Sequence, residues 1–390
     1  MRVLHTLDSL NRGGAEILTL DVCRNAGRFG IDLVFAAFGG GDLEEDFKNS
    51  DVEFIRLQRD LPVDLNLVWQ LRKIIQEKNI EIVHSHQPVE ALHIFLATLG
   101  IKNVKIIQTH HGFISGKKNT LIAKYLSPKM DANIACSRGV FPWLRREIGL
   151  DTSKNFYLVY NGVDEKRLQP SGHSVKKELG FSEESLLLGM IANFRPDQTK
   201  DQMTVCLTLV EVFEKYKDAN FIFVGKVSEG GEENFEKCIN FCDKNGIGEK
   251  VFFLGGREDV SDILASLDLF IFSSLKEGLP ISAVEAMLTK VPLIISDIPP
   301  LLEVTNNGKC AEVFKTKNSE ELAEKVLKLL ENKDLQKNLA EDAFAFARQT
   351  FSIEAHLQGL KTLYLKLQNQ ANTNELNEVS EDNQTILNLE

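Results

Sequence analysis

The chain has 390 residues, 43% of them hydrophobic and 26% charged, which is enough for two globular domains with cores that need no disulfide or metal. Its 45 Lys and Arg residues against 56 Asp and Glu residues give a formal net charge of −11, which argues against nucleic-acid binding by the chain as a whole. The start of the sequence lacks the apolar region of a signal peptide, and no apolar run is long enough to span a membrane. We therefore expect a cytoplasmic protein whose six scattered cysteines are buried thiols.

Short apolar runs that are typical of strands alternate with amphipathic helical patterns along the whole chain. The predicted strands of the first half are 3–7, 31–38, 53–57, 80–85, 104–109, 132–136 and 156–160, and those of the second half are 186–193, 220–225, 250–254, 267–272 and 291–296. Continuous apolar runs are typical of strands buried on both faces, so we expect parallel sheets with helices on each side. The repeated order of strand and helix predicts an α/β fold with two Rossmann-like, doubly wound domains.

A polar, breaker-rich stretch from Gln169 to Ser174 marks the predicted boundary between the two halves. We expect an N-terminal domain over 1–168 and a C-terminal domain over 175–350. A helix over 351–368 should follow, and the acidic tail over 369–390 should be disordered. Ligands of open α/β sheets bind at the carboxyl ends of the strands, so the cleft between two such domains is the expected active site.

Paired glycines, Gly13 and Gly14, follow the first predicted strand and precede a helical pattern. Glycines let the backbone approach a ligand closely, and the amides at a helix N-terminus favour an anion. The pattern is neither a dinucleotide-binding fingerprint nor a P-loop, and an ordinary turn between strand and helix is the alternative.

Histidines stand at the ends of two later strands, His84 and His86 at one and His110 and His111 at the next. They allow three interpretations: groups that bind or help to transfer a sugar, a metal site, or packed polar residues at the start of loops. A metal site would also need a carboxylate or thiolate, and Glu90 is the obvious candidate nearby.

In the second half, Arg195 and Lys200 lie between the first strand and its helix. The helix dipole disfavours cations at this end, so their presence makes more sense if an anion joins them. An Arg fork and a Lys point charge suit a diphosphate, while solvated surface charges are the alternative.

The most informative stretch runs from Ser273 to Met287, directly after a buried strand. Pro280 suits the first turn of a helix, whose amides would face an anion. Glu277 and Glu285 are poor phosphate ligands but good acceptors for sugar hydroxyls. The backbone segment that would lie at the anion is Gly278, Leu279, Pro280 and Ile281.

These motifs together resemble the retaining nucleotide-sugar glycosyltransferases of family 4, which have the GT-B fold. The spacing of Glu277 and Glu285 matches the family's E-x7-E motif, with Ala286-Met287 and the segment 291–297 behind it. Supporting matches occur at Gly13-Gly14-Ala15-Glu16, Thr109-His110-His111-Gly112, Ser137 and Asn161-Gly162-Val163-Asp164, so that the resemblance covers nearly all of 1–365.

The resemblance implies roles for individual residues. Glu277 would bind donor-sugar hydroxyls and Glu285 the ribose hydroxyls. Arg195 and Lys200 would hold the diphosphate together with the amides of Gly278, Leu279, Pro280 and Ile281. His111 would lie at the sugar, and the Gly13-Gly14 loop near the phosphates and the acceptor. The last helix, over 351–368, would cross back onto the N-terminal domain. His111, Glu277, Arg195 and Lys200 are thus the implied catalytic residues, with no bound metal or other cofactor.

The sequence departs from the family pattern at three places, one of which is Asp201 after Lys200, where Gly is common. Ala192-Asn193 stands where Gly-Arg is usual, with Arg195 two positions later, and Thr289-Lys290 stands where a small residue and Gly are usual. Whether Arg195 occupies the usual arginine position is therefore left open at this point.

The expected activity is transfer of a sugar, with retention, from a nucleotide-diphosphate-sugar to a glycan, a lipid-linked acceptor or a small molecule, in cell-surface polysaccharide or glycolipid assembly. A sugar-nucleotide epimerase, a phosphorylase and a non-catalytic binding partner remain alternatives, because fold alone does not separate them.

The segment from Lys102 to Arg146 carries nine Lys and Arg residues and one acid, Asp131. Leu121, Ile122, Tyr125 and Leu126 stand among these cations. Such a segment suits an anionic membrane surface, with a solvated helix face as the alternative. The protein is accordingly expected in the cytoplasm, peripheral to the inner face of the membrane.

Overall fold

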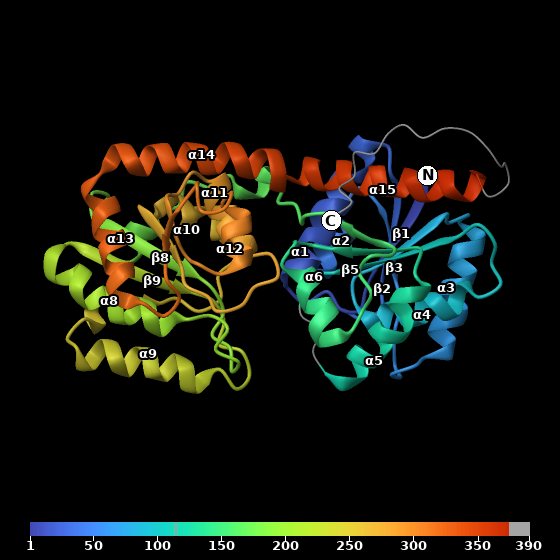
Figure 1. Cartoon of the computed structure of the whole chain (residues 1–390), viewed down its shortest axis with the longest axis horizontal. Helices are drawn as coiled ribbons and strands as arrows, with labels where there is room; N and C mark the ends of the chain where they lie inside the picture. Colours follow the sequence, from blue (N-terminus) through green and yellow to red (C-terminus); the bar gives the residue numbers. More distant parts are fainter. Residues whose placement is uncertain (113, 115, 374–390) are drawn as a thin grey trace. The chain divides into compact units, whose positions relative to one another are not determined.

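A computed structural model describes residues 1–112, 114 and 116–373, and it divides the chain into two compact units (Figure 1). The first unit contains Met1–Val163 and the segment from Ile353 onward, and the second contains Asp164–Ser352. No helix within the described ranges is both long enough and apolar enough to cross a membrane.

The first unit is built on a seven-stranded sheet in the order β3-β2-β1-β4-β5-β6-β7, and all its neighbouring strands are parallel. Its strands are β1 (Arg2–Leu7), β2 (Asp32–Ala37), β3 (Glu53–Arg56), β4 (Ile82–Ser85), β5 (Lys105–His110), β6 (Ala132–Ala135) and β7 (Phe156–Leu158). Its α-helices are α1 (Gly14–Asn25), α2 (Glu44–Lys48), α3 (Leu65–Glu77), α4 (Pro88–Thr98), α5 (Lys117–Leu126), α6 (Val140–Trp143) and α15 (Ile353–Thr373).

Both faces of this sheet are buried, and alternate residues of a strand enter different cores. On β1, Val3 and Leu7 pack with α1 and α15, whereas Leu4 packs with α3 and α4 on the other face. This is the period of two that a strand imposes. Helices on both faces explain why the strands are continuous apolar runs.

The last helix, α15, completes the first unit although it follows the whole second unit in the sequence. One stripe of this helix is buried in the same core as β1 and α1, and it consists of Ile353, Leu357, Leu360, Leu363, Tyr364 and Leu367. The spacing of three and four residues is that of a helix face turned toward a core. This helix continues beyond residue 368, the predicted end, and the rest of the predicted tail lies outside the described residues.

The second unit is built on a six-stranded parallel sheet in the order β10-β9-β8-β11-β12-β13. Its strands are β8 (Leu186–Ile191), β9 (Ala219–Val224), β10 (Val251–Phe253), β11 (Leu269–Phe272), β12 (Leu293–Ser296) and β13 (Glu312–Phe314). Its α-helices are α7 (Val175–Glu178), α8 (Gln202–Lys215), α9 (Glu232–Lys244), α10 (Val260–Ser266), α11 (Ile281–Leu288), α12 (Pro299–Val304), α13 (Ser319–Glu331) and α14 (Lys333–Phe351).

The predicted fold class is confirmed: both units are doubly wound, parallel α/β sheets of the Rossmann-like kind. The edge strand β13 has no counterpart among the predicted strands. It is three residues long and only partly buried at Glu312 and Val313, so it lacks the continuous apolar run that marks the other strands.

Candidate functional site

In the first unit, β1, β4 and β5 bring four histidines into contact. Register places His5 opposite His84 on neighbouring strands, and their ring centroids are 4.5 Å apart. Just beyond β4, His86 Nδ1 lies 2.7 Å from His111 Nε2. The sequence predicts His84, His86 and His111 as candidate site residues, but no pattern in it points to His5. His110 points elsewhere, because its Nε2 lies 3.1 Å from Asn133 Oδ1.

Burial keeps these imidazole rings neutral. It lowers the pKa of His5 and of His111 to about 3, and it lowers the pKa of His84 and of His86 well below the ordinary value. At neutral pH the rings therefore act as hydrogen-bonding groups and not as cations. A neutral ring suits a sugar hydroxyl, since it offers one donor and one acceptor.

A pocket of about 350 Å³ lies at this end of the sheet and is lined by His86, Gln108, Thr109 and His111, among others. Gln108 is almost fully buried, and neither its amide oxygen nor its amide nitrogen has a hydrogen bond to a described residue. Buried polar groups normally have partners. The pocket thus offers a donor and an acceptor to a polar ligand.

Glu90, in the first turn of α4, joins the ends of β1 and β4. Its carboxyl accepts from Thr6 Oγ1 at 3.1 Å, from the Asp8 amide at 2.9 Å and from the His86 amide at 2.9 Å. Complete burial raises the pKa of Glu90 to about 8. Since all its bonds are to protein groups, Glu90 fixes the backbone beside His86 and is not placed as a metal ligand.

The Gly13-Gly14 loop ends in the N-terminus of α1, where Gly13 is the capping residue with extended backbone (φ −151°, ψ 172°). A methyl group added at Gly14 would meet no atom within 4 Å, so open space adjoins this glycine. The backbone N–H groups in the first turn of α1 are therefore accessible to a ligand that binds the first unit.

In the second unit, Lys200 and Glu277 form an ion pair through Lys200 Nζ and Glu277 Oε1. Both side chains are largely buried, with 17% and 10% of their surfaces exposed. Ser274 holds the pair, because its Oγ donates to the same carboxylate oxygen at 2.6 Å. The ammonium also lies 4.7 Å from the centre of the Phe272 ring. Because the ion pair is largely buried and has these additional partners, the side chains of Lys200 and Glu277 are held in one arrangement.

The loop 278–280 leads from this ion pair into α11. Pro280 is the capping residue of this helix and not its first residue, so the helix begins at Ile281. Glu285 lies in its second turn and pairs with Arg167, whose Nη2 is 2.6 Å from Glu285 Oε1. No local pattern in the sequence predicts this role of Arg167, because it lies 118 residues from Glu285 in a short 3₁₀ helix, Glu165–Leu168.

Arg195 is not part of this cluster. Half of its side chain is exposed, and it pairs with Asp197 two residues later at 3.1 Å. The preceding Asn193, which stands in the place of the family's usual arginine, accepts a hydrogen bond from the Lys226 amide at 2.9 Å. A pocket of about 160 Å³ in the second unit is lined instead by Lys200, Lys237 and Lys317.

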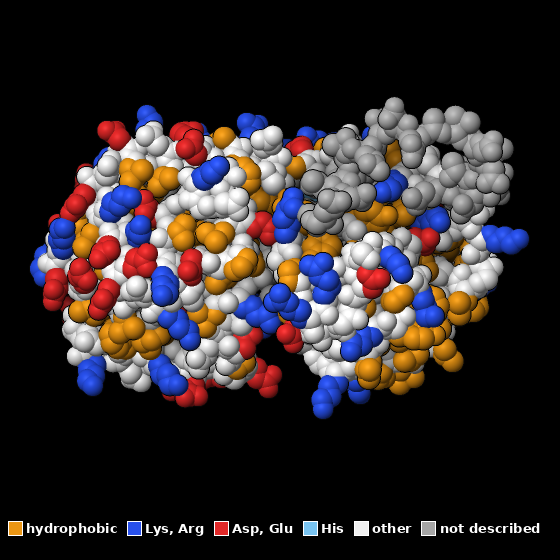
Figure 2. Space-filling view, viewed as in Figure 1, with side chains coloured by type: hydrophobic (Ala, Val, Ile, Leu, Met, Phe, Trp, Pro, Cys, Tyr) orange, Lys and Arg blue, Asp and Glu red, His pale blue; other side chains and the backbone are white. Residues whose placement is uncertain are grey.

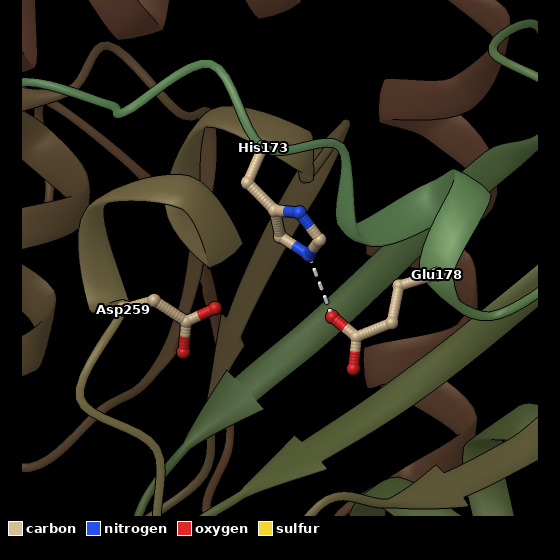
Figure 3. A group of neighbouring side chains, drawn as sticks. All are labelled: His173, Glu178 and Asp259. Atoms are coloured by element: carbon tan, nitrogen blue, oxygen red, sulfur yellow. Dashed lines mark hydrogen bonds and ion pairs between the residues drawn. The ribbon is translucent and has the colours of Figure 1, made fainter.

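One group of side chains in the described part of the chain has the spacing of metal ligands, namely His173, Glu178 and Asp259 (Figure 3). Arg257 already serves both carboxylates, at 2.7 Å from Glu178 and 2.6 Å from Asp259. It also lowers the pKa of Glu178 to about 2. The group is therefore an ion-pair network centred on a guanidinium.

Two models of known protein families match the chain, and each covers most of one structural unit. Residues 12–167 match the model of the family "Glycosyltransferase Family 4", and residues 173–346 match the model "Glycosyl transferases group 1". The chain is a family 4-type glycosyltransferase. The resemblance seen in the sequence is thereby confirmed, and so is the GT-B fold, because a solved glycosyltransferase matches 94% of the chain.

Among solved structures, this glycosyltransferase resembles one from Rickettsia africae, with a TM-score of 0.81 at 20% identity over 94% of this chain and 98% of that one. It also resembles HepE from Anabaena in complex with UDP and glucose, with a TM-score of 0.77 at 20% identity over 93% and 99%. A curated relative is N-acetyl-alpha-D-glucosaminyl L-malate synthase of Bacillus anthracis, 26% identical over 78% of this chain and 79% of the relative.

Lys200 offers a direct test of the site in the second unit. We expect Lys200→Met to weaken binding of nucleoside diphosphates at least about tenfold, because it removes a largely buried cation. Lys215→Met is the matched control, since Lys215 lies on α8 in an exposed pair with Glu331. Calorimetric titration with UDP, GDP and ADP measures the affinity of each variant. Equal affinity in the two variants would refute the assignment of Lys200 to a diphosphate site.

Proposed function

We propose that the chain transfers a sugar from a nucleotide-diphosphate-sugar to its acceptor with retention of anomeric configuration. The ion pair of Lys200 and Glu277 carries this proposal. It sets a cation suited to phosphate beside a carboxylate suited to sugar hydroxyls, and it lies one loop before the N-terminus of α11.

Each part of the donor has a proposed partner. Lys200, Arg195 and the amides of Gly278, Leu279 and Ile281 would hold the diphosphate. Pro280 lacks an amide hydrogen and would shape the loop. For Arg195 this role requires that it leave Asp197, which is feasible for a half-exposed pair.

The sugar and the ribose of the nucleotide sugar would bind other residues. The sugar hydroxyls would bind Glu277, and the ribose hydroxyls would bind Glu285, which Arg167 holds in place. From the first unit, His111 would contact the sugar, and the Gly13-Gly14 loop would lie near the phosphates.

The proposed reaction breaks the bond between the anomeric carbon and the diphosphate oxygen and forms a bond from that carbon to the acceptor oxygen on the same face. The acceptor's proton passes to the leaving phosphate. Lys200 and the helix amides stabilise the charge that develops on the leaving group, which is electrostatic preorganisation. Since protein groups would neutralise the diphosphate, we expect turnover without a metal ion or other cofactor.

Gln108 and its pocket support a polar acceptor bound to the first unit, since two buried amide atoms there have no described partner. The names of the relatives indicate two classes of acceptor. One is the malate synthase already described. Another is N,N'-diacetylbacillosaminyl-diphospho-undecaprenol alpha-1,3-N-acetylgalactosaminyltransferase of Campylobacter jejuni, 30% identical over 52% of each chain. For this chain we favour a lipid-linked or glycan acceptor in cell-surface polysaccharide or glycolipid assembly.

A kinetic comparison of two ion pairs tests the proposal. We expect Lys200→Ala and Glu277→Ala each to lower kcat/KM at least about tenfold, or roughly 1.4 kcal/mol of transition-state binding. The exposed pair of Lys215 and Glu331 is the matched control, and its alanine variants should keep normal turnover. Near-normal kcat/KM in both site variants would overturn the assignment.

The same assay separates the alternative activities. Incubation of the donor without acceptor would convert it to another sugar nucleotide if the chain were an epimerase, whereas a transferase would hydrolyse it slowly. A phosphorylase would need inorganic phosphate, and a non-catalytic partner would show no turnover at all. Membership of the glycosyltransferase family favours transfer.

An apolar and basic face of the first unit supports placement at a membrane. We call it the α3–α5 face. Its exposed apolar side chains are Leu61, Val63, Leu65, Trp69, Leu99, Leu121 and Tyr125. Figure 2 shows hydrophobic side chains gathered with Lys and Arg at the lower right, over α3 to α5 of Figure 1. Lys117, Lys118 and Lys124 of the basic segment 102–146 lie on α5, the helix that also carries Leu121 and Tyr125.

This composition matches an anionic lipid surface. Trp and Tyr favour the boundary between lipid headgroups and acyl chains, while each Lys near anionic lipid contributes up to about 1 kcal/mol. Exposed apolar clusters of this kind mark interaction surfaces. We therefore propose that the protein works in the cytoplasm, bound peripherally to the inner face of the membrane through the α3–α5 face.

Flotation with vesicles tests the α3–α5 face. The protein should float with vesicles rich in phosphatidylglycerol at low salt and be released at high salt, because screening weakens the lysine contribution. Leu121→Ser should reduce binding severalfold. Leu207→Ser is the matched control, since Leu207 is an exposed leucine of the second unit. Failure to float at low salt, or equal loss in both variants, would exclude this surface.

A further inference from the structure

A buried glutamine of β5, Gln108, lines the pocket of the first unit with an amide that has no partner. The residue is 1% exposed, and neither its Oε1 nor its Nε2 has a hydrogen bond to a residue in the described ranges. A glutamine amide offers one acceptor oxygen and a nitrogen with two donor hydrogens. Because burying such atoms without partners destabilises a fold, their presence beside a pocket points to a ligand.

The neighbours of Gln108 in the sheet do not supply these hydrogen bonds. Parallel register pairs Gln108 with Ser85 of β4 and with Asn133 of β6, and residues paired in this way point to the same face. Ser85 Oγ donates instead to a backbone carbonyl of β5 at 3.1 Å. Asn133 Nδ2 donates to the Ser127 carbonyl at 2.8 Å, and its Oδ1 lies 3.1 Å from His110 Nε2. Both neighbours thus have other partners, and the amide of Gln108 is left for a ligand.

The pocket presents polar groups but no charged side chain. Its lining includes Gln87, Thr109, Asn119 and three histidines whose pKa values burial lowers, and no Asp, Glu, Lys or Arg occurs among the described residues that line it. The N-termini of α1 and α4 contribute only partial charges, and Pro88 at the start of α4 has no amide hydrogen to offer. A carboxylate or phosphate would lose its hydration here without a compensating cation. The pocket therefore suits a neutral ligand with several hydroxyls.

The amide of Gln108 matches two adjacent hydroxyls of a sugar ring. Its oxygen and nitrogen are attached to one carbon, so they lie side by side and need two partners that also lie side by side. One hydroxyl donates to Oε1 and the next accepts from Nε2. A single hydroxyl does not satisfy both atoms with good geometry. Hydroxyls on neighbouring carbons of a pyranose supply the pair.

We propose that Gln108 is a specificity-determining residue that binds two adjacent hydroxyls of a neutral sugar in the acceptor, and that its pocket rejects anionic acceptors. Assignment of this sugar to the acceptor rests on the proposed function. Binding of the sugar at Gln108 does not, because it requires no transfer.

Saturation-transfer NMR of the full chain, without any nucleotide sugar, tests the binding by itself. The neutral probes are the methyl glycosides of glucose, galactose, mannose and N-acetylglucosamine, and the anionic probe is L-malate. We expect at least one glycoside to bind and malate not to bind, because the pocket offers hydrogen bonds but no cation. Binding of malate in place of the glycosides, or binding of none of the glycosides, would overturn the proposal.

Gln108→Met assigns the bound glycoside to this residue. Methionine keeps the length of the side chain and removes both hydrogen-bonding atoms, so the glycoside should bind at least about tenfold more weakly. Gln76→Met is the matched control, since Gln76 is an exposed glutamine of α3. Removal of either of the two hydroxyls from the glycoside should weaken binding to the wild type but not to Gln108→Met. Equal binding by the two variants, or equal sensitivity to the missing hydroxyl in the wild type and Gln108→Met, would refute the assignment.

The melting temperature of the ligand-free protein distinguishes an amide that awaits a ligand from one that protein or water already satisfies. Gln108→Met should raise Tm by about 2 °C or more, because it removes buried polar atoms that have no partners. Asn133→Leu is the comparison and should lower Tm, since both ends of its amide are bonded. A fall in Tm for Gln108→Met as well would contradict the proposal.

Kinetics separate this inference from the proposed function. With the glycoside that binds best as acceptor, Gln108→Met should raise the KM for the acceptor at least about tenfold and change the KM for the donor less than twofold. Weaker glycoside binding with an unchanged acceptor KM would uphold the sugar site and refute its assignment to the acceptor. Absence of transfer by the wild type would refute the proposed function, whereas the NMR titrations would still decide whether Gln108 binds a sugar.

Discussion

Parallel pairing of every strand is the constraint on which the rest of this structure depends. A parallel sheet carries all the carboxyl ends of its strands at one edge, so residues far apart in the sequence meet there. In the first unit this edge collects His5, His86 and His111, and in the second it collects Lys200 and Glu277. The candidate site residues therefore lie in the strands and loops at this edge, where each sheet holds them in place.

Burial gives the two edges opposite electrostatic characters. In the first unit it lowers the pKa of the histidines, so that neutral rings form directional hydrogen bonds. In the second unit, Lys200 and Glu277 form a largely buried ion pair, and Ser274 adds a hydrogen bond to the carboxylate. A neutral edge suits sugar and acceptor hydroxyls, whereas a charged edge suits a diphosphate. This division is consistent with the proposed transfer from a nucleotide sugar.

Local patterns in the sequence predicted most of the fold and part of the site. The apolar runs predicted the strands because burial on both faces favours apolar side chains at most positions, and the spacing of Glu277 and Glu285 marked the loop and helix at α11. Tyr364 and Arg167 were not predictable in this way. Tyr364 meets His84 across 280 residues, and Arg167 meets Glu285 across 118. Such pairs depend on how α15 and a short 3₁₀ helix return to a sheet, which no local pattern encodes.

The stereochemistry of the product tests the central claim most directly. The claim is that attack and departure occur on the same face of the sugar, with Lys200 and the α11 amides stabilising the leaving diphosphate. The ¹H NMR coupling constant of the anomeric proton should be followed from the first turnovers with an α-linked donor sugar. An α-linked product is the predicted result, and a β-linked product would contradict the account.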